Sequence, residues 1–189
     1  MAKFRTSVVR RIEDEQAKLT PLSTEVFWQL YEACLALEKR VAYYHEKLQA
    51  LARAHPVCQR VHAVPGIGPL TATALVAAVP DATHFKNGRQ FAAWLGLVPR
   101  ERSTGGKPRL LGISKRGDVY LRTLLVHGAR ATLRWVARKH DPRSPWVRAL
   151  MARRGNNRAA VALANKNARM VWALLAHHQE YNPPVAAQS

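Results

Sequence analysis

The chain has 189 residues, 48% of them hydrophobic, which is enough for one core domain with an extended arm. Its 30 Lys and Arg against 12 Asp and Glu give a formal charge of +18, which indicates a polyanionic partner, nucleic acid before an anionic membrane. The sequence contains no apolar run of about 18 residues and no signal-peptide pattern, so we expect a cytoplasmic protein and no membrane partner.

Residues that could bind a metal are sparse in this sequence. Cys34 and Cys58 are separated by 24 residues, about 36 Å along one helix, so we expect free thiols. The eight histidines show no ligand spacing beyond the adjacent pair His177 and His178. The sequence therefore predicts no structural zinc and no metal bound by this chain.

A heptad pattern dominates the first part of the chain. Apolar residues recur at alternating gaps of three and four: Phe27, Leu30, Cys34, Leu37, Val41, Tyr44, Leu48 and Leu51. The pattern predicts a long coiled-coil helix that starts after Thr20-Pro21, with Ser23 or Thr24 as its N-cap. Its partner could be an earlier helix near residues 7–19, folded back as a hairpin, or a second copy of the chain. We assign residues 1–55 to this helical arm or linker.

A second pattern follows in residues 61–79. Pro65 ends one helix, Gly66 and Gly68 form a tight turn, and Pro69 suits the first position of the next helix. This order predicts a helix-hairpin-helix, whose turn would offer backbone N–H groups to a nucleic-acid phosphate. The alternative is a structural turn that touches no nucleic acid.

Helical patterns fill most of the remaining sequence. We expect a short helix that ends at Gly96 and longer helices near residues 118–139, 144–153 and 157–181, with Asp118 as an N-cap. Arg122, Arg130, Arg134 and Arg138 would form a cationic stripe on the helix that follows Asp118, and this stripe could bind along a nucleic-acid phosphate backbone. We expect Trp135, Trp146 and Trp172 in the core. Because no alternating strand occurs, the predicted fold is all-α, a helical bundle over residues 56–181 that follows the arm, with a disordered tail at 182–189.

The segment between the short helix and Asp118 is basic and rich in glycine. Ser103 and Thr104 are adjacent hydroxyls, either of which could attack a phosphodiester once deprotonated. The candidate phosphate contacts around them are Arg100, Arg102, Lys107, Arg109, Lys115 and Arg116. Each of these cations alone could equally be a solvated surface charge.

Four stretches together resemble the C-terminal part of insertion sequence family 110 transposases, a bacterial group that includes the Piv-like DNA invertases and carries a Transposase 20 type domain. The stretches are Val64-Pro-Gly-Ile-Gly68, Gln90-Phe-Ala-Ala-Trp-Leu-Gly-Leu-Val-Pro-Arg100, Ser103-Thr-Gly-Gly-Lys107 and Gly112-Ile-Ser-Lys-Arg-Gly-Asp-Val-Tyr-Leu-Arg122. The match extends over roughly residues 55–180, and the heptad helix resembles the linker coiled coil through which such proteins pair as dimers or tetramers.

The resemblance implies a DNA recombinase in which a serine attacks the phosphodiester and is joined covalently to the DNA. It also implies a structured guide RNA that pairs with the DNA partners. Counted from Pro99, the family's serine position corresponds to Thr104 in one variant of the motif and to Ser103 in the other. We favour Ser103, because its primary hydroxyl is less hindered than the β-branched one of Thr104.

One part of the family pattern is missing from this sequence. Family members begin with a RuvC-like domain in which an Asp-Glu-Asp-Asp set binds divalent metal, and we expect Mg²⁺ there. Beyond residue 60 the only acids are Asp81, Glu101, Asp118, Asp141 and Glu180. We therefore expect a truncated or split transposase, inactive alone, which a separate RuvC-like chain could complement. The alternative is a non-catalytic DNA- or RNA-binding helical module.

Overall fold

The computed structural model describes residues 2–15, 18–102, 110–136 and 143–182. The chain divides into two compact units, Met1–Lys47 and Leu48–Ser189. The predicted hydroxyls Ser103 and Thr104, and the cations Lys107, Arg109 and Arg138, lie outside the described residues, as does nearly all of the predicted tail. Within the described residues, no helix is both long enough and apolar enough to cross a bilayer.

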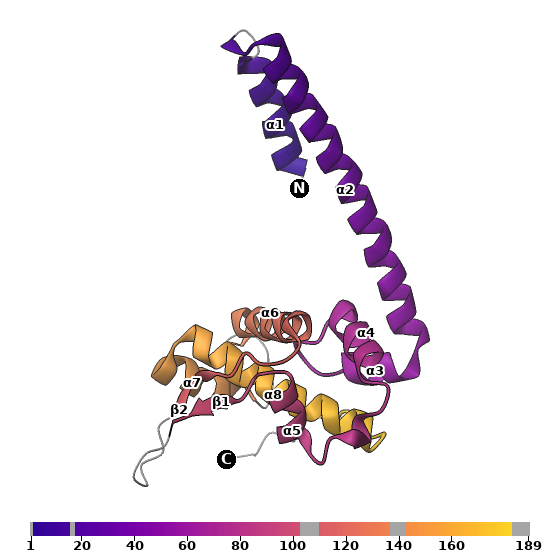
Figure 1. Cartoon of the computed structure of the whole chain (residues 1–189), viewed down its shortest axis with the longest axis vertical. Coiled ribbons are helices and arrows are strands. Elements are labelled where there is room, and N and C mark those ends of the chain that lie inside the picture. Colours follow the sequence, from indigo (N-terminus) through magenta and orange to yellow (C-terminus); the bar gives the residue numbers. More distant parts are fainter. Residues whose placement is uncertain (1, 16–17, 103–109, 137–142, 183–189) are drawn as a thin grey trace. The chain divides into compact units, whose positions relative to one another are not determined.

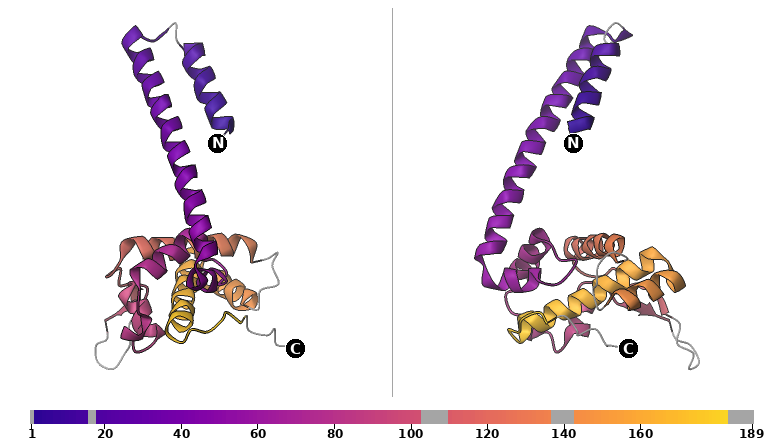
Figure 2. Two further views of the ribbon diagram at one scale, coloured as in Figure 1. Left: turned by 90° about the vertical axis from the view of Figure 1, so that its right-hand side faces the viewer. Right: turned by 180° about the vertical axis from the view of Figure 1, so that it is seen from behind.

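The first unit contains α1 (Ala2–Glu15) and most of α2 (Pro21–Ala54). Figures 1 and 2 show α1 running back beside the first half of α2, and Ile12 of α1 is only 8% exposed. Helix α2 begins earlier than its predicted caps. Thr20 accepts a hydrogen bond at Oγ1 from the backbone N–H of Ser23 (3.2 Å), so Thr20 takes the capping role that we predicted for Ser23 or Thr24.

The second unit is built almost entirely of helices, as predicted. Its elements in chain order are α3 (Pro56–His62), α4 (Pro69–Ala78), the 3₁₀ helix η2 (Ala82–His84), α5 (Gly88–Trp94), β1 (Pro99–Glu101), β2 (Leu110–Ile113), α6 (Val119–Trp135), α7 (Ser144–Arg154) and α8 (Asn156–Ala176). Asp118 caps α6 as expected, since its Oδ1 accepts from the N–H of Leu121 at 2.8 Å. The all-α prediction is confirmed; the short two-stranded sheet is an addition to it.

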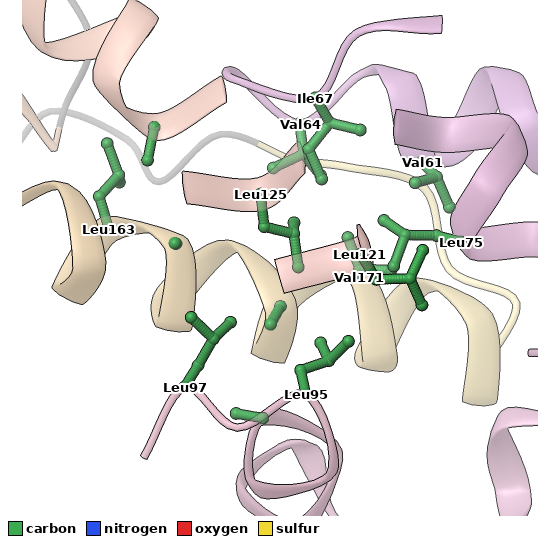
Figure 3. Close-up of a cluster of buried hydrophobic side chains, with 14 of the residues drawn as sticks. Val61, Val64, Ile67, Leu75, Leu95, Leu97, Leu121, Leu125, Leu163 and Val171 are labelled. Carbon is green, nitrogen blue, oxygen red and sulfur yellow. The ribbon is translucent and has the colours of Figure 1, made fainter. Parts of the chain in front are cut away.

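Helix α8 is the centre of the hydrophobic core. It packs against α3, α5, α6 and α7, and Figures 1 and 2 show these helices arranged around it. Figure 3 shows Val171 of α8 close to Leu121 of α6 and Leu75 of α4, and Leu163 farther along α8 in the same buried cluster. Small residues on α8 are fully buried, namely Ala159, Ala160, Ala164 and Ala168. Their size lets the neighbouring helices approach α8 closely.

Two glycines bring the α3–α4 turn into direct contact with α6. Gly66 has φ +94°, a left-handed conformation that L side chains rarely adopt. A Cβ at Gly128 of α6 would collide with the carbonyl oxygen of Gly66, and a Cβ at Gly66 would lie 2.7 Å from Thr132 Oγ1. The turn therefore packs backbone to backbone against α6.

A buried polar pair fixes the same turn to α8. Asn167 is fully buried and donates from Nδ2 to the carbonyl of Pro65 at 3.1 Å. Its Oδ1 accepts from Nη1 of Arg143, which is 3% exposed, also at 3.1 Å. Because buried polar groups are costly unless they are hydrogen-bonded, these contacts specify where the turn sits on the core.

Candidate nucleic-acid interface

Strands β1 and β2 lie on either side of the glycine-rich basic segment in the sequence and pair with each other. Strands β1 and β2 are antiparallel, with Pro99 opposite Ile113, Glu101 opposite Leu110, and a register shift between the two pairs. The N–H of Ser114 donates to the carbonyl of Val98 at 2.8 Å, which extends the pairing toward the core. The sheet therefore anchors both ends of the segment that carries the predicted hydroxyls.

The predicted cations of the basic segment that are described lie on the surface. Arg100 is exposed in β1, Arg102 directly follows it, and Lys115 and Arg116 follow β2. Lys115 has φ +56°. Beside it, Gly117 has φ +123°, and a Cβ there would collide with the carbonyl oxygen of Trp94. The turn between β2 and α6 thus packs closely on the end of α5.

A large groove runs beside this sheet. It has a volume of about 2050 Å³ and is lined by residues of α5, β1, β2, α7 and α8. Its cationic lining residues are Arg89, Arg100, Lys115, Arg154, Arg158, Lys166 and Arg169. None of the described residues that line it is Asp or Glu. A groove with one sign of charge attracts polyanions and raises their local concentration.

Two of the predicted site residues line the groove together with cations that were not predicted from the sequence. Arg100 and Lys115 line it, whereas Arg102 and Arg116 do not. The missed cations come from α5, from the end of α7 and from α8. Arg158, Lys166 and Arg169 recur at gaps of eight and three, close to one helical face, and this spacing was the available signal. Only the fold shows that this face lies opposite the basic strands.

The predicted stripe on α6 has other contacts. Arg122 is half-buried and donates from Nη1 to the carbonyl of Leu95 at 3.2 Å. It thereby gives a hydrogen-bond partner to a carbonyl at the C-terminal end of α5 and places a positive charge there. Arg130 donates from Nη2 to Oδ1 of Asn157 at 3.3 Å and so joins α6 to the start of α8. Neither arginine lines the groove.

The two predicted glycines of the α3–α4 turn differ in their surroundings. Gly66 packs against Gly128, and this contact alone explains why position 66 is a glycine. Gly68 is exposed, forms the N-cap of α4 and has open space where a Cβ would lie. Of the two, Gly68 is the one with room for a phosphate beside its backbone.

The tryptophans also differ from the expectation that all three are core residues. Trp172 is half-buried against the core, and its Nε1 donates to the carbonyls of Ala82 (3.1 Å) and Phe85 (3.2 Å). Trp135 is 50% exposed and Trp146 is 40% exposed, so the expectation was wrong for these two. Trp146 lines the groove.

Among the described residues, the ionisable groups with clearly displaced pKa values, Cys58 and Asp81, lie outside the groove. Burial raises the pKa of the Cys58 thiol. The Thr83 hydroxyl, which donates to Asp81 Oδ1 at 2.6 Å, lowers the pKa of that carboxyl, and the Thr83 N–H adds to the effect. Among the described residues, no group of three or more His, Cys, Asp or Glu side chains could hold a metal ion. The described residues therefore do not fit a Mg²⁺ site.

The known proteins to which this chain is similar include transposases. The model of the family described as Transposase IS116/IS110/IS902 matches residues 58–170. A probable family 20 transposase of Pseudomonas aeruginosa is 53% identical over 169 residues, which cover 89% of this chain and 50% of that protein. The transposase for insertion sequence element IS1111A of Coxiella burnetii is 51% identical over 90% of this chain and 47% of its own length.

A more distant relative gives the same family. The transposase for insertion sequence element IS1328 of Yersinia enterocolitica is 35% identical over 88% of this chain and 50% of its own length. The chain spans about half the length of these curated relatives. Because the family model matches more than half of the sequence, the chain belongs to the IS116/IS110/IS902 transposase family.

Proposed function

We propose that this chain is the DNA-binding part of a transposase and that its cationic groove holds a nucleic-acid backbone. The observation that carries the proposal is the groove itself, with seven cations from four elements and the turn after β2, and no acid among its described lining residues. Arginine and lysine bind phosphates whatever the base sequence, so the groove would hold a strand without selecting a target.

We further propose that Ser103 or Thr104 is the nucleophile, with Ser103 favoured. The proposal is supported by position in the sequence, since Arg100 lines the groove and lies in β1, three residues before Ser103. The hydroxyl oxygen would bond to phosphorus while the bond from phosphorus to the 3′ oxygen breaks. The hydroxyl proton passes to a base and the 3′ oxygen gains a proton. The phosphodiester energy is thereby stored for rejoining.

The metal and the guide would come from outside the described residues. We propose that carboxylates of a RuvC-like domain bind Mg²⁺, either elsewhere in the same polypeptide or in a separate chain, because no described cluster here can do so. We also propose that a structured RNA selects the DNA by base pairing, while cations of this chain hold backbones. The exposed apolar residues of α2 support pairing of chains through that helix.

Binding tests the proposal first. Replacing Arg158, Lys166 and Arg169 of α8 together by Ala should weaken duplex DNA binding at least about tenfold in a mobility-shift titration, because three phosphate contacts are lost. The matched control replaces three cations of α2, Lys39, Arg40 and Lys47, by Ala and should bind like the wild type. Equal weakening in both triple variants would show that general charge, rather than the groove, binds DNA.

Covalent trapping tests the nucleophile. The element's DNA ends are incubated with the chain, a RuvC-like domain, guide RNA and Mg²⁺, and protein–DNA adducts are separated on denaturing gels. Ser103→Ala should abolish the adduct and Thr104→Ala should retain it. Adduct at the wild-type level in the variant that combines Ser103→Ala and Thr104→Ala would exclude both hydroxyls. Salt-sensitive binding without any adduct under these conditions would instead support the alternative function, a non-catalytic nucleic-acid-binding module.

A further inference from the structure

Trp146 is the accessible aromatic side chain in the groove. It is the third residue of α7, lines the groove and is 40% exposed. The other tryptophan that lines the groove, Trp172, uses its indole N–H to bond two backbone carbonyls, which is a structural role. Only Trp146 of the two therefore offers a large exposed aromatic surface to a ligand.

A cation already lies on the ring of Trp146. Nζ of Lys166 is 4.7 Å from the centroid of the indole, within the range of a cation–π contact. Lys166 belongs to α8, as do the groove cations Arg158 and Arg169. From Arg158 to Arg169 the helix rises about 16 Å, so the cations extend well beyond the size of one phosphate group. The aromatic surface therefore lies beside an extended row of positive charge.

Much of the rest of the lining is apolar, although it also includes Asn87, Ser114, Asn157 and Asn165. Leu97, Leu111, Leu150, Val161 and Met170 contribute to the apolar part. The volume of about 2050 Å³ exceeds the roughly 300–1,000 Å³ of a small-molecule site, which suits a polymer. A duplex presents phosphates and sugars on its outside and keeps its base faces stacked inside. An unpaired strand presents phosphates and free base faces together, which matches both parts of this lining.

We propose that the groove binds an unpaired stretch of nucleic acid, with one base stacked on Trp146 and neighbouring phosphates held by Lys166 and Arg158. The inference rests on the proposed function and makes it more specific, because a duplex would use only the groove cations, whereas an unpaired strand would use the cations and the indole of Trp146. Stacking is tolerant of sequence, since every base has an aromatic face. An acidic protein segment could satisfy the cations but would gain little from an exposed indole.

Fluorescence anisotropy of the full chain tests the inference. The probes are a labelled DNA strand of about 20 nucleotides, the RNA strand of the same sequence and the blunt DNA duplex. Trp146→Ala should raise the Kd for one or both single strands about 5- to 140-fold and leave the duplex Kd within about twofold. Comparison of the DNA and RNA strands shows which nucleic acid uses the site.

Two variants control for folding and for the loss of an indole. Trp146→Phe retains an aromatic face, so its single-strand Kd should stay within about threefold of wild type, while quenching of protein fluorescence by the bound strand should decrease. Trp135→Ala removes an exposed tryptophan that does not line the groove and should leave every Kd unchanged. Circular dichroism verifies that each variant is folded.

The possible failures are distinguishable. An equal loss of duplex and single-strand binding in Trp146→Ala, or no loss at all, overturns the unpaired-strand inference and leaves the proposed DNA binding intact. Displacement of the strand by poly-glutamate at equal charge concentration also overturns it, in favour of an acidic protein partner. If the wild-type chain binds none of the three probes, the proposed function fails as well.

Discussion

Replacing Gly128 by Ala should change the free energy of unfolding in the opposite direction from most Gly to Ala changes inside helices. In a helix interior, replacing Gly by Ala ordinarily stabilises by about 1 kcal/mol. Here the new Cβ would collide with the carbonyl oxygen of Gly66, so α6 and the α3–α4 turn must separate. We expect Gly128→Ala to lower the free energy of unfolding by about 1–3 kcal/mol in urea titrations. Gly112→Ala is the control, since nothing lies within 4 Å of its Cβ position, and should change stability by less than about 0.5 kcal/mol.

Cys58 should be unreactive while the chain is folded. Its side chain is 3% exposed, and burial raises the pKa of its thiol, which leaves little of the nucleophilic thiolate. In a Cys34→Ser variant, labelling by a disulfide reagent at mildly alkaline pH should be at least about a hundredfold slower in the folded than in the denatured chain. The stability that this thiol contributes is complete below its unfolded pKa and is lost as pH rises through the folded value. Fast labelling of the folded chain would contradict the burial.

Helix α2 carries a row of exposed apolar residues. The exposed residues that fall on the heptad seam are Phe27, Leu30, Leu37, Val41, Tyr44 and Leu51. We expect the wild-type chain to dimerise or tetramerise in sedimentation experiments at micromolar concentration. Leu37→Glu places a charge on the seam and should raise the dissociation constant at least about tenfold.

The matched control for this helix is Ala36→Glu. It adds the same charge one residue away, at an exposed position off the seam. It should associate like the wild type, because position 36 does not face the partner in the heptad pattern. A wild-type chain that stays monomeric at all concentrations, or equal effects of the two substitutions, would contradict pairing through α2.

The elements that carry strong local signals were predictable. Heptad spacing predicted α2, Asp118 predicted the start of α6, and Pro69 predicted the start of α4. The strands were not predicted, because three- and four-residue strands are too short to show alternation. Helix α8 was predicted to continue to residue 181 but ends at Ala176, since the apolar period alone does not mark an end.

The candidate interface was predictable only in part. Arg100 and Lys115 were found because they flank a glycine-rich segment, a local property of the sequence. Arg89 and Arg154 became candidates only when the fold placed α5 and α7 beside the same groove as α8. Gly66 was assigned to phosphate binding from its motif, although its close partner Gly128 lies 62 residues away in the chain. Long-range contacts of this kind leave no periodic signal.

At the scale of the whole molecule, charge and core are both concentrated in one unit. Residues 48–189 contain 22 Lys and Arg against 5 Asp and Glu, whereas residues 1–47 contain 8 against 7. The main hydrophobic core cluster also lies within the second unit, from Val61 to Leu175. The second unit therefore has the components of an autonomous domain, while the first has mainly one helix pair.

A fragment of residues 48–189 should separate the two activities that we assign to the units. It should fold, with helical circular dichroism and a cooperative urea transition, because it retains the whole core cluster. Its DNA affinity should fall with salt as steeply as that of the full chain, within about one unit in the slope of log K against log salt, because the groove cations all remain. It should sediment as a monomer, since most of the α2 seam is removed. A fragment that folds but loses more than about two units of slope would place a large share of the DNA contacts on residues 1–47.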